Sequence, residues 1–255
     1  MNKLNSFIKR FVLFVLFCII SLGCAHYYYT PNVQNIPLFN GKEEGIMSLS
    51  MGGAMEITAI DAQAAMSLTD HVALMANYAL VTGGNHSTDR NWGNGSLFEG
   101  GMGYFRNIGQ SFVFELYGGA GGGSEHHQYS YYDFGYLKNI YDGTADISFS
   151  RLFLQPSVGC SYKWLEGAFS MRLCRMAFNR IDDHIISSGT YGLDVLENNK
   201  YQFFLEPAFT LRGGGKELRL QVQYVFSENL TSHYMQSEKG MISFGLYLSL
   251  GKKIF

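Results

Sequence analysis

Apolar and polar residues alternate with a period of two along much of the chain, most clearly near its carboxyl end. Between Ile242 and Leu250 every second residue is Ile, Phe or Leu, and the residues between them are Ser, Gly or Tyr. Residues 218–226 repeat the pattern, with Leu, Val, Tyr and Phe on one face and Arg219, two glutamines and Val225 on the other. Strict alternation of this kind predicts β-strands with one apolar and one polar face.

Weaker forms of the same alternation extend over the preceding part of the chain and predict an all-β fold. The early segments are rich in Ala, Gly and Met rather than in large apolar residues. We expect about ten strands, with eight as the alternative count, over residues 45–53, 57–67, 71–80, 96–106, 112–117, 151–162, 169–174, 202–212, 218–226 and 241–250.

The apolar faces predict a barrel that crosses a membrane. Beyond the amino-terminal region no apolar run approaches the length of about 20 residues that a transmembrane helix needs. Without such helices a chain can span a bilayer only as a closed β-barrel, which leaves no backbone group unpaired in lipid. Charged residues make up 16% of the chain, against about 25% in soluble domains. The sequence therefore predicts a single antiparallel up-and-down transmembrane β-barrel.

The connections between the expected strands alternate between short and long. Short turns are expected at 69–70, 107–110, 163–166 and 213–215, and long connections at 81–95, 123–147, 179–200 and 227–239. The first connection, near 52–56, is the exception, because it is short where the alternation would place a long one. Outer-membrane barrels have short periplasmic turns and longer extracellular loops. The pattern predicts an outer-membrane location, and an even strand count would return both termini to the periplasm.

The amino-terminal region is typical of an export signal. Basic residues precede an unbroken apolar run from Phe11 to Ile20, and the run ends at Gly23 and Cys24. A Gly-Cys pair in this position predicts a lipoprotein signal peptide over residues 1–23 and lipidation of Cys24. The acyl chains would then lie in the inner leaflet of the outer membrane. Ordinary cleavage after Ala25 is the alternative. Residues 24–44 are then expected to form an extended linker, and residues 45–255 the barrel.

Three segments resemble those of known proteins: Tyr29-Thr-Pro-Asn-Val-Gln-Asn-Ile-Pro-Leu-Phe39, Gln63-Ala-Ala-Met-Ser-Leu-Thr-Asp-His71 and Leu248-Ser-Leu-Gly-Lys-Lys-Ile-Phe255. Together they resemble a large group of poorly characterised outer-membrane β-barrel lipoproteins of Gram-negative bacteria. The resemblance covers the whole mature chain and indicates no enzymatic reaction. Phe255 is similar to the terminal aromatic residue that the barrel-assembly machinery recognises, which implies this machinery and outer-membrane lipid as partners.

Eight charged residues lie at polar-face positions of the expected strands, four of each sign. A buried charge is costly unless it is neutralised. We therefore expect these side chains to pair with one another and fill a narrow lumen with salt bridges. A catalytic site built on a pair of carboxylates is the alternative. The residues are Asp61, Glu99, Glu115, Glu206, Arg151, Arg172, Arg212 and Arg219.

Other candidates for chemistry are read as structural. The histidines of the expected extracellular loops, His86, His126, His127, His184 and His233, have no spaced Cys or carboxylate partner, which favours solvated side chains over a metal site. The aromatic run 126–136 favours a membrane-interface girdle over a sugar- or protein-binding platform. The glycine-rich run 118–123 is not followed by the Lys-Ser/Thr pair and the helix of a phosphate-binding loop. Cys160 and Cys174 fall on opposite faces and are expected as free thiols.

The sequence thus predicts no catalytic residue, metal or cofactor. A net charge of −2 gives no footprint for nucleic acid. The expected function is a non-enzymatic outer-membrane barrel with a plugged lumen, whose loops serve envelope structure or the binding of a surface ligand that the sequence does not identify. The alternatives are a small selective channel, a membrane-embedded hydrolase or acyltransferase with a His or Ser at the rim paired with a carboxylate, and a soluble lipocalin-like binding protein.

Overall fold

The computed structural model describes residues 27–54, 57–84, 92–133, 138–184, 193–232 and 234–251. The expected signal peptide, Cys24, His86, His233 and Phe255 lie outside these ranges. No helix within them is long and apolar enough to cross a bilayer.

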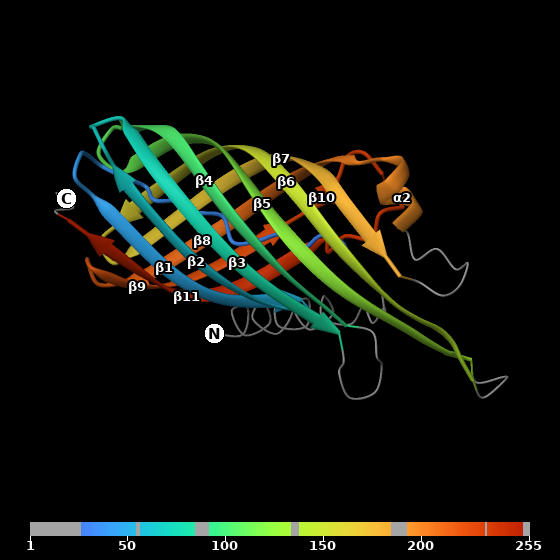
Figure 1. Ribbon diagram of the computed structural model, residues 1–255. Coiled ribbons are helices and arrows are strands. Elements are labelled where there is room, and N and C mark those ends of the chain that lie inside the picture. Colours follow the sequence, from blue (N-terminus) through green and yellow to red (C-terminus); the bar gives the residue numbers. More distant parts are fainter. Residues whose placement is uncertain are drawn as a thin grey trace, which may run out of the picture.

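Ten long antiparallel strands form a closed barrel (Figure 1). Each strand from β1 to β8 pairs with the long strand that follows it, and β11 closes the ring between β9 and β1. The count of ten is confirmed, and the alternative of eight is wrong. The elements are β1 (Gly45–Ala54), β2 (Ile57–Ser67), β3 (Val72–Gly84), β4 (Trp92–Ile108), β5 (Phe112–Asp133), β6 (Lys138–Tyr162), β7 (Leu165–Asp183), α2 (Leu193–Asn198), β8 (Tyr201–Gly214), β9 (Leu218–Phe226), the two-residue β10 (Glu228–Asn229) and β11 (Gly240–Leu250).

The apolar faces point outward, as the alternation predicts. On β9 and β11 the residues of the apolar face, such as Leu220 and Phe244, are exposed, while Arg219, Gln223, Ser243 and Tyr247 of the other face are buried in the lumen. Because a soluble lipocalin-like protein would turn its apolar face inward, this alternative is wrong. The outer belt includes Met47, Leu49, Phe98, Met102, Leu152, Leu154, Phe209, Leu220, Phe244 and Leu246.

The strands β3 to β7 extend further than expected, because part of each expected long loop is paired. Most of the expected loop 123–147 belongs to the β5–β6 hairpin, in which Ser124 lies opposite Ser148 and His126 opposite Asp146. The expectation of a loop here is wrong. Beyond the lipid the outer face of a strand meets water, so it carries Ser, His and Asp, and the apolar alternation that marks a membrane strand disappears.

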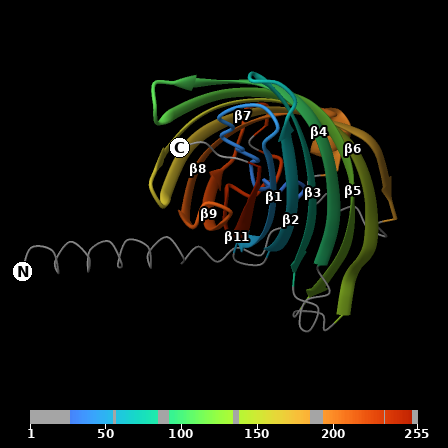
Figure 2. The same ribbon diagram turned by 90° about the vertical axis from the view of Figure 1, so that its left-hand side faces the viewer.

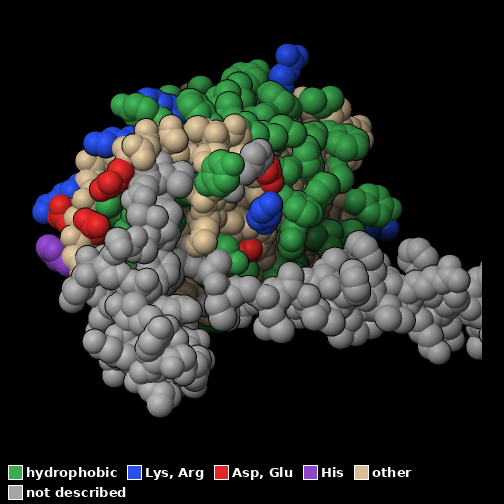
Figure 3. Space-filling model, turned by 90° about the vertical axis from the view of Figure 1, so that its right-hand side faces the viewer, with side chains coloured by type: hydrophobic (Ala, Val, Ile, Leu, Met, Phe, Trp, Pro, Cys, Tyr) green, Lys and Arg blue, Asp and Glu red, His purple; other side chains and the backbone are tan. Residues whose placement is uncertain are grey.

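The two ends of the barrel differ as the connections predict. One end carries the short turns between β2 and β3, β4 and β5, β6 and β7, and β8 and β9; the other carries the β5–β6 hairpin tip, α2 and the segment 227–239. We call these the short-turn end and the long-connection end. By the rule for outer-membrane barrels, the long-connection end faces the cell exterior. Figure 3 views this end, where charged side chains gather along one side and apolar ones cover the flank.

The expected linker lies inside the barrel. Residues 27–44 contain no regular secondary structure, and Figure 2, which views the short-turn end, shows this blue segment enclosed by the ring of strands. Side chains from Tyr28 to Phe39 are almost all buried. We call residues 27–40 the plug. Its first described residue, Tyr27, lies at the long-connection end, and its last residue leads to β1 at the short-turn end.

Candidate functional site

The backbone of the plug is hydrogen-bonded by side chains of the barrel wall. An extended segment inside a lumen forms no backbone hydrogen bonds with a neighbouring strand, so its buried N–H and C=O groups need other partners. The wall supplies them at successive residues. Gln63 donates to the carbonyl of Val33 (2.7 Å), Gln155 to Asn35 (2.8 Å), Arg212 to Ile36 (2.8 Å) and Tyr247 to Pro37 (2.7 Å), and the N–H of Gln34 donates to Gln223 (2.6 Å).

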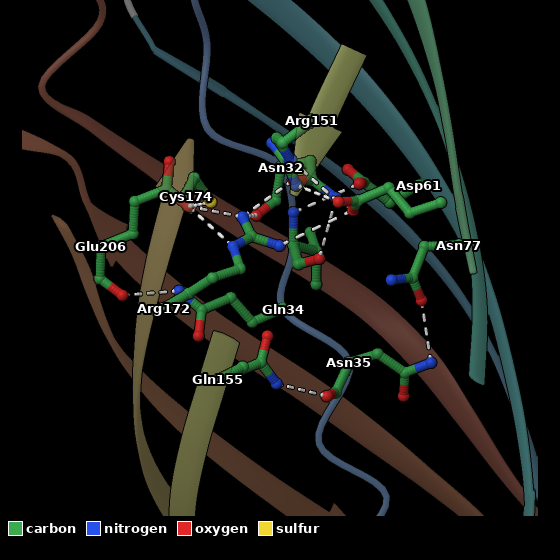
Figure 4. A network of polar contacts seen from close by, with 12 residues as sticks. Asn32, Gln34, Asn35, Asp61, Asn77, Arg151, Gln155, Arg172, Cys174 and Glu206 are labelled. Carbon is green, nitrogen blue, oxygen red and sulfur yellow. Dashed lines mark hydrogen bonds and ion pairs between the residues drawn. The ribbon is translucent and has the colours of Figure 1, made fainter. Parts of the chain in front are cut away.

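Asn32 lies at the centre of a buried charge network (Figure 4). Arg151 of β6 pairs with Glu99 at 2.7 Å, and Arg172 of β7 pairs with Glu206 at 2.7 Å. Both guanidinium groups also donate to the side-chain oxygen of Asn32, at 2.7 and 2.8 Å. The network therefore joins strands β4, β6, β7 and β8 to the plug.

Tyr29 connects the two ion pairs from the plug side. Its hydroxyl accepts a hydrogen bond from Arg151 at 3.0 Å and donates one to Glu206. Its ring stacks on Phe204, with ring centroids 4.0 Å apart. Tyr29 thus fills the lumen with an apolar ring while its polar end completes the network, the usual requirement for a buried tyrosine.

A second charge cluster lies nearer the short-turn end. Glu166 accepts from Arg212 and from Arg219, each at 2.6 Å. The Arg212 guanidinium also lies over the ring of Tyr247, 3.8 Å from its centroid. Glu166 was missed by the sequence reasoning because it lies at the expected turn. The alternation of faces along β7 could have identified it, since Glu166 lies an even number of residues from Ser170 and Arg172 and therefore shares their inner face.

Two of the expected lumen charges meet the plug and not an arginine. Asp61 accepts from the N–H of Val33 at 3.2 Å, and Glu115 accepts from the N–H of Phe39 at 3.4 Å and from Ser157 at 3.2 Å. Neither carboxyl forms an ion pair within the described ranges. The expectation that all eight charges pair with one another is therefore wrong for Asp61 and Glu115. It is also wrong for Arg212 and Arg219, whose ion-pair partner is Glu166.

The structure brings the predicted lumen residues to one interior. Each of the eight is 2% exposed or less. Arg151, Arg172, Glu99 and Glu206 meet at one level, and Arg212 and Arg219 at another. The sequence reasoning missed the plug itself. Its buried Asn32 donates to Glu99, while Gln34 donates to the backbone carbonyl of Glu206 and Asn35 to the side chain of Asn77. Its two prolines suggested an extended segment but gave no sign that it runs inside the barrel.

The rim at the long-connection end carries a separate polar group. On the outer face His126 of β5 and Asp146 of β6 are 2.7 Å apart (Nδ1 to Oδ1). They border a hollow of about 730 Å³ whose lining also includes Tyr78, Ser124 and Arg180. This is the rim pairing of a histidine with a carboxylate that the hydrolase alternative needs. Within the described ranges no group of three or more metal-ligating side chains lies together.

Several weaker expectations are corrected. His126 and His127 lie on β5 and not in a loop, and His127 is buried against Tyr28, with ring centroids 5.3 Å apart. Tyr129 also points into the lumen, so it is no part of an outer aromatic girdle.

Cys160 and Cys174 are free thiols on opposite faces, as expected. In the glycine run, Gly119 leaves room for the ring of Phe153, which would lie 2.6 Å from an added Cβ.

The closed antiparallel barrel with an apolar outer belt and a polar lumen defines an outer-membrane β-barrel protein. No known family matches the sequence, and no curated protein matches it. Among solved structures, the chain is similar to the KdgM porin (8% identity, TM-score 0.38, covering 81% of this chain and 99% of that one). It is also similar to LpxR from Salmonella typhimurium (9%, 0.39, 80% and 99%) and to the outer-membrane protease OmpT from Escherichia coli (8%, 0.41, 82% and 92%).

Proposed function

We propose that this protein is a non-conducting, non-enzymatic outer-membrane barrel whose lumen is closed by its own amino-terminal plug and whose extracellular end serves envelope structure or surface binding. The observation that carries the proposal is the plug, which is buried and hydrogen-bonded to the wall along its length. Partners of this role are outer-membrane lipid around the belt and the barrel-assembly machinery during insertion.

The chemistry of the lumen supports closure. Four buried arginines face five buried carboxyl groups, so the lumen carries no large excess of either charge that would attract a solute ion of opposite sign. The side chains that would line a water path instead bind the plug backbone. The groups are Arg151, Arg172, Arg212 and Arg219 with Asp61, Glu99, Glu115, Glu166 and Glu206.

Conductance of the purified protein in planar bilayers tests the proposal. The full chain is expected to give no stable current steps, and a variant that lacks residues 27–40 is expected to conduct. Heat-modifiable gel mobility of both proteins shows whether the barrel has folded. Stable conductance of the intact, folded chain would contradict the closed lumen and favour the selective channel.

The expected lipid anchor is part of the proposal. Gly23-Cys24 after the apolar run, together with the resemblance to outer-membrane barrel lipoproteins, supports a diacylated Cys24. Radiolabelled fatty acid is expected to enter the wild-type protein and not the Cys24→Ser variant. Mass spectrometry of the mature amino-terminal peptide distinguishes acylation from cleavage after Ala25, which would leave an unmodified peptide.

A second candidate function is a surface hydrolase at the rim. Asp146 holds one ring nitrogen of His126, an arrangement that orients an imidazole to act as a base through its other nitrogen. Ser124 and Ser148 are cross-strand neighbours on the same outer face. Hydrolysis of phospholipid or peptide substrates that is lost in both His126→Ala and Asp146→Asn, but kept in Arg175→Ala, would favour the hydrolase over the non-enzymatic barrel.

A further inference from the structure

The two ends of the plug are held at opposite ends of the barrel. At its amino end, the N–H of Tyr28 donates to the carbonyl of Gln236 at 2.9 Å, and the N–H of Glu238 donates to the carbonyl of Tyr29 at 2.8 Å. Residues 236 and 238 belong to the segment between β10 and β11, at the long-connection end. The hydroxyl of Tyr129, near the far end of β5, donates to that of Tyr28 at 3.1 Å. The plug therefore begins at the long-connection end.

The carboxyl end of the plug is tied to short turns. Asn107, in the last residues of β4, donates to the carbonyl of Asn40 at 2.7 Å. The N–H of Lys42 donates to Asp70, in the turn between β2 and β3, at 3.2 Å. The chain thus passes once through the lumen before β1 begins its return within the wall.

We infer that the plug is threaded from the cell exterior, so that its amino end at Tyr27 faces the outside of the cell while the carboxyl end of β11 faces the periplasm. The plug adds one crossing to the ten of the wall. An odd number of crossings places the two ends on opposite sides of the membrane, whereas an even count alone would place both in the periplasm.

This topology changes the expected position of a lipid anchor. Cys24 precedes Tyr27 by three residues, and three residues of extended chain reach at most about 11 Å. An acyl group on Cys24, which rests on the proposed function, would therefore enter the outer leaflet and not the inner one. It would tether the protein at the same surface as its long connections.

Surface accessibility of an epitope tag tests the inference. The tag is inserted after His26 in one variant, after Ser232 in the segment between β10 and β11 in a second, and after Gly215 in the β8–β9 turn in a third. Antibody binding is measured on intact and on permeabilised cells expressing the full chain. Heat-modifiable mobility confirms that each variant folds.

The tag after His26 is expected to bind antibody on intact cells as strongly as the tag after Ser232, while the tag after Gly215 needs permeabilisation. A tag after His26 that behaves like the Gly215 tag would overturn the threading. If the insertion prevents folding, Tyr27→Cys labelled with a membrane-impermeant maleimide gives the same readout, with Ser232→Cys and Lys216→Cys as controls.

The result is separable from the proposed function. A periplasmic tag in a barrel without conductance would overturn the threading and leave the closed lumen intact. A surface-exposed tag on a barrel that conducts would support the threading and contradict the closed lumen.

Discussion

Arg172 of β7 is joined to Asn32 of the plug by two hydrogen bonds, one to the backbone carbonyl at 3.1 Å and one to the side-chain oxygen at 2.8 Å. The same guanidinium pairs with Glu206. One wall residue thus satisfies a buried carboxylate and holds the plug at the same time. Because both roles depend on a charge that water cannot reach, the barrel and its plug are coupled in stability.

Arg172→Ala is expected to lower the free energy of unfolding by about 3 to 5 kcal/mol, because it leaves Glu206 buried beside one fewer cation. Urea unfolding of the protein in lipid vesicles measures the change. Arg175→Ala is the matched control, since Arg175 lies on the outer face of the same strand and contacts the ring of Tyr201. Equal losses in the two variants would contradict the buried network.

A disulfide between the plug and the wall is expected in the double variant Leu38→Cys, Gly159→Cys. A Cβ added at Gly159 would lie 3.1 Å from Cγ of Leu38, so two cysteines there come within bonding reach. Mass spectrometry under non-reducing conditions detects the bond. Leu38→Cys with Gly122→Cys, on the exposed outer face, should remain reduced; absence of the bond in the first pair would mean that the plug does not occupy the lumen.

Tyr247→Phe is expected to destabilise the protein by about 0.5 to 1.5 kcal/mol, because it removes the hydrogen bond to the carbonyl of Pro37 and leaves that carbonyl unpaired. The ring under Arg212 remains, so the barrel should still fold. Urea unfolding measures the effect. A change well above this range would indicate that the hydroxyl has partners beyond Pro37.

Leu246→Arg is expected to cost about 2 to 4 kcal/mol, because Leu246 lies mid-strand on the lipid face of β11. Leu250→Arg, at the short-turn end of the same face, should cost about 0 to 1 kcal/mol. Folding equilibria in vesicles compare the two. A tolerated arginine at position 246 would count against the membrane topology.

The sequence by itself determined the strands that cross the membrane, because lipid imposes one rule on every outward residue there. Ile242 to Leu250 alternate since one face meets hydrocarbon and the other the lumen, and the same parity placed Arg172 and Glu206 inside. Where the strands leave the lipid this rule ends. The outer residues Ser124, His126 and Asp146 therefore carried no strand signal, and their hairpin was expected to be a loop.

Only the tertiary structure decided what fills the lumen. Residues 27–40 have no periodicity, and their backbone is satisfied by side chains distant in sequence, such as Gln155, Arg212 and Tyr247. Contacts of that kind exist only after the barrel has closed around the segment. Local pattern could therefore predict the wall and its inward charges, but the path of the plug, and with it the side of the membrane on which Tyr27 lies, follows from the closed fold.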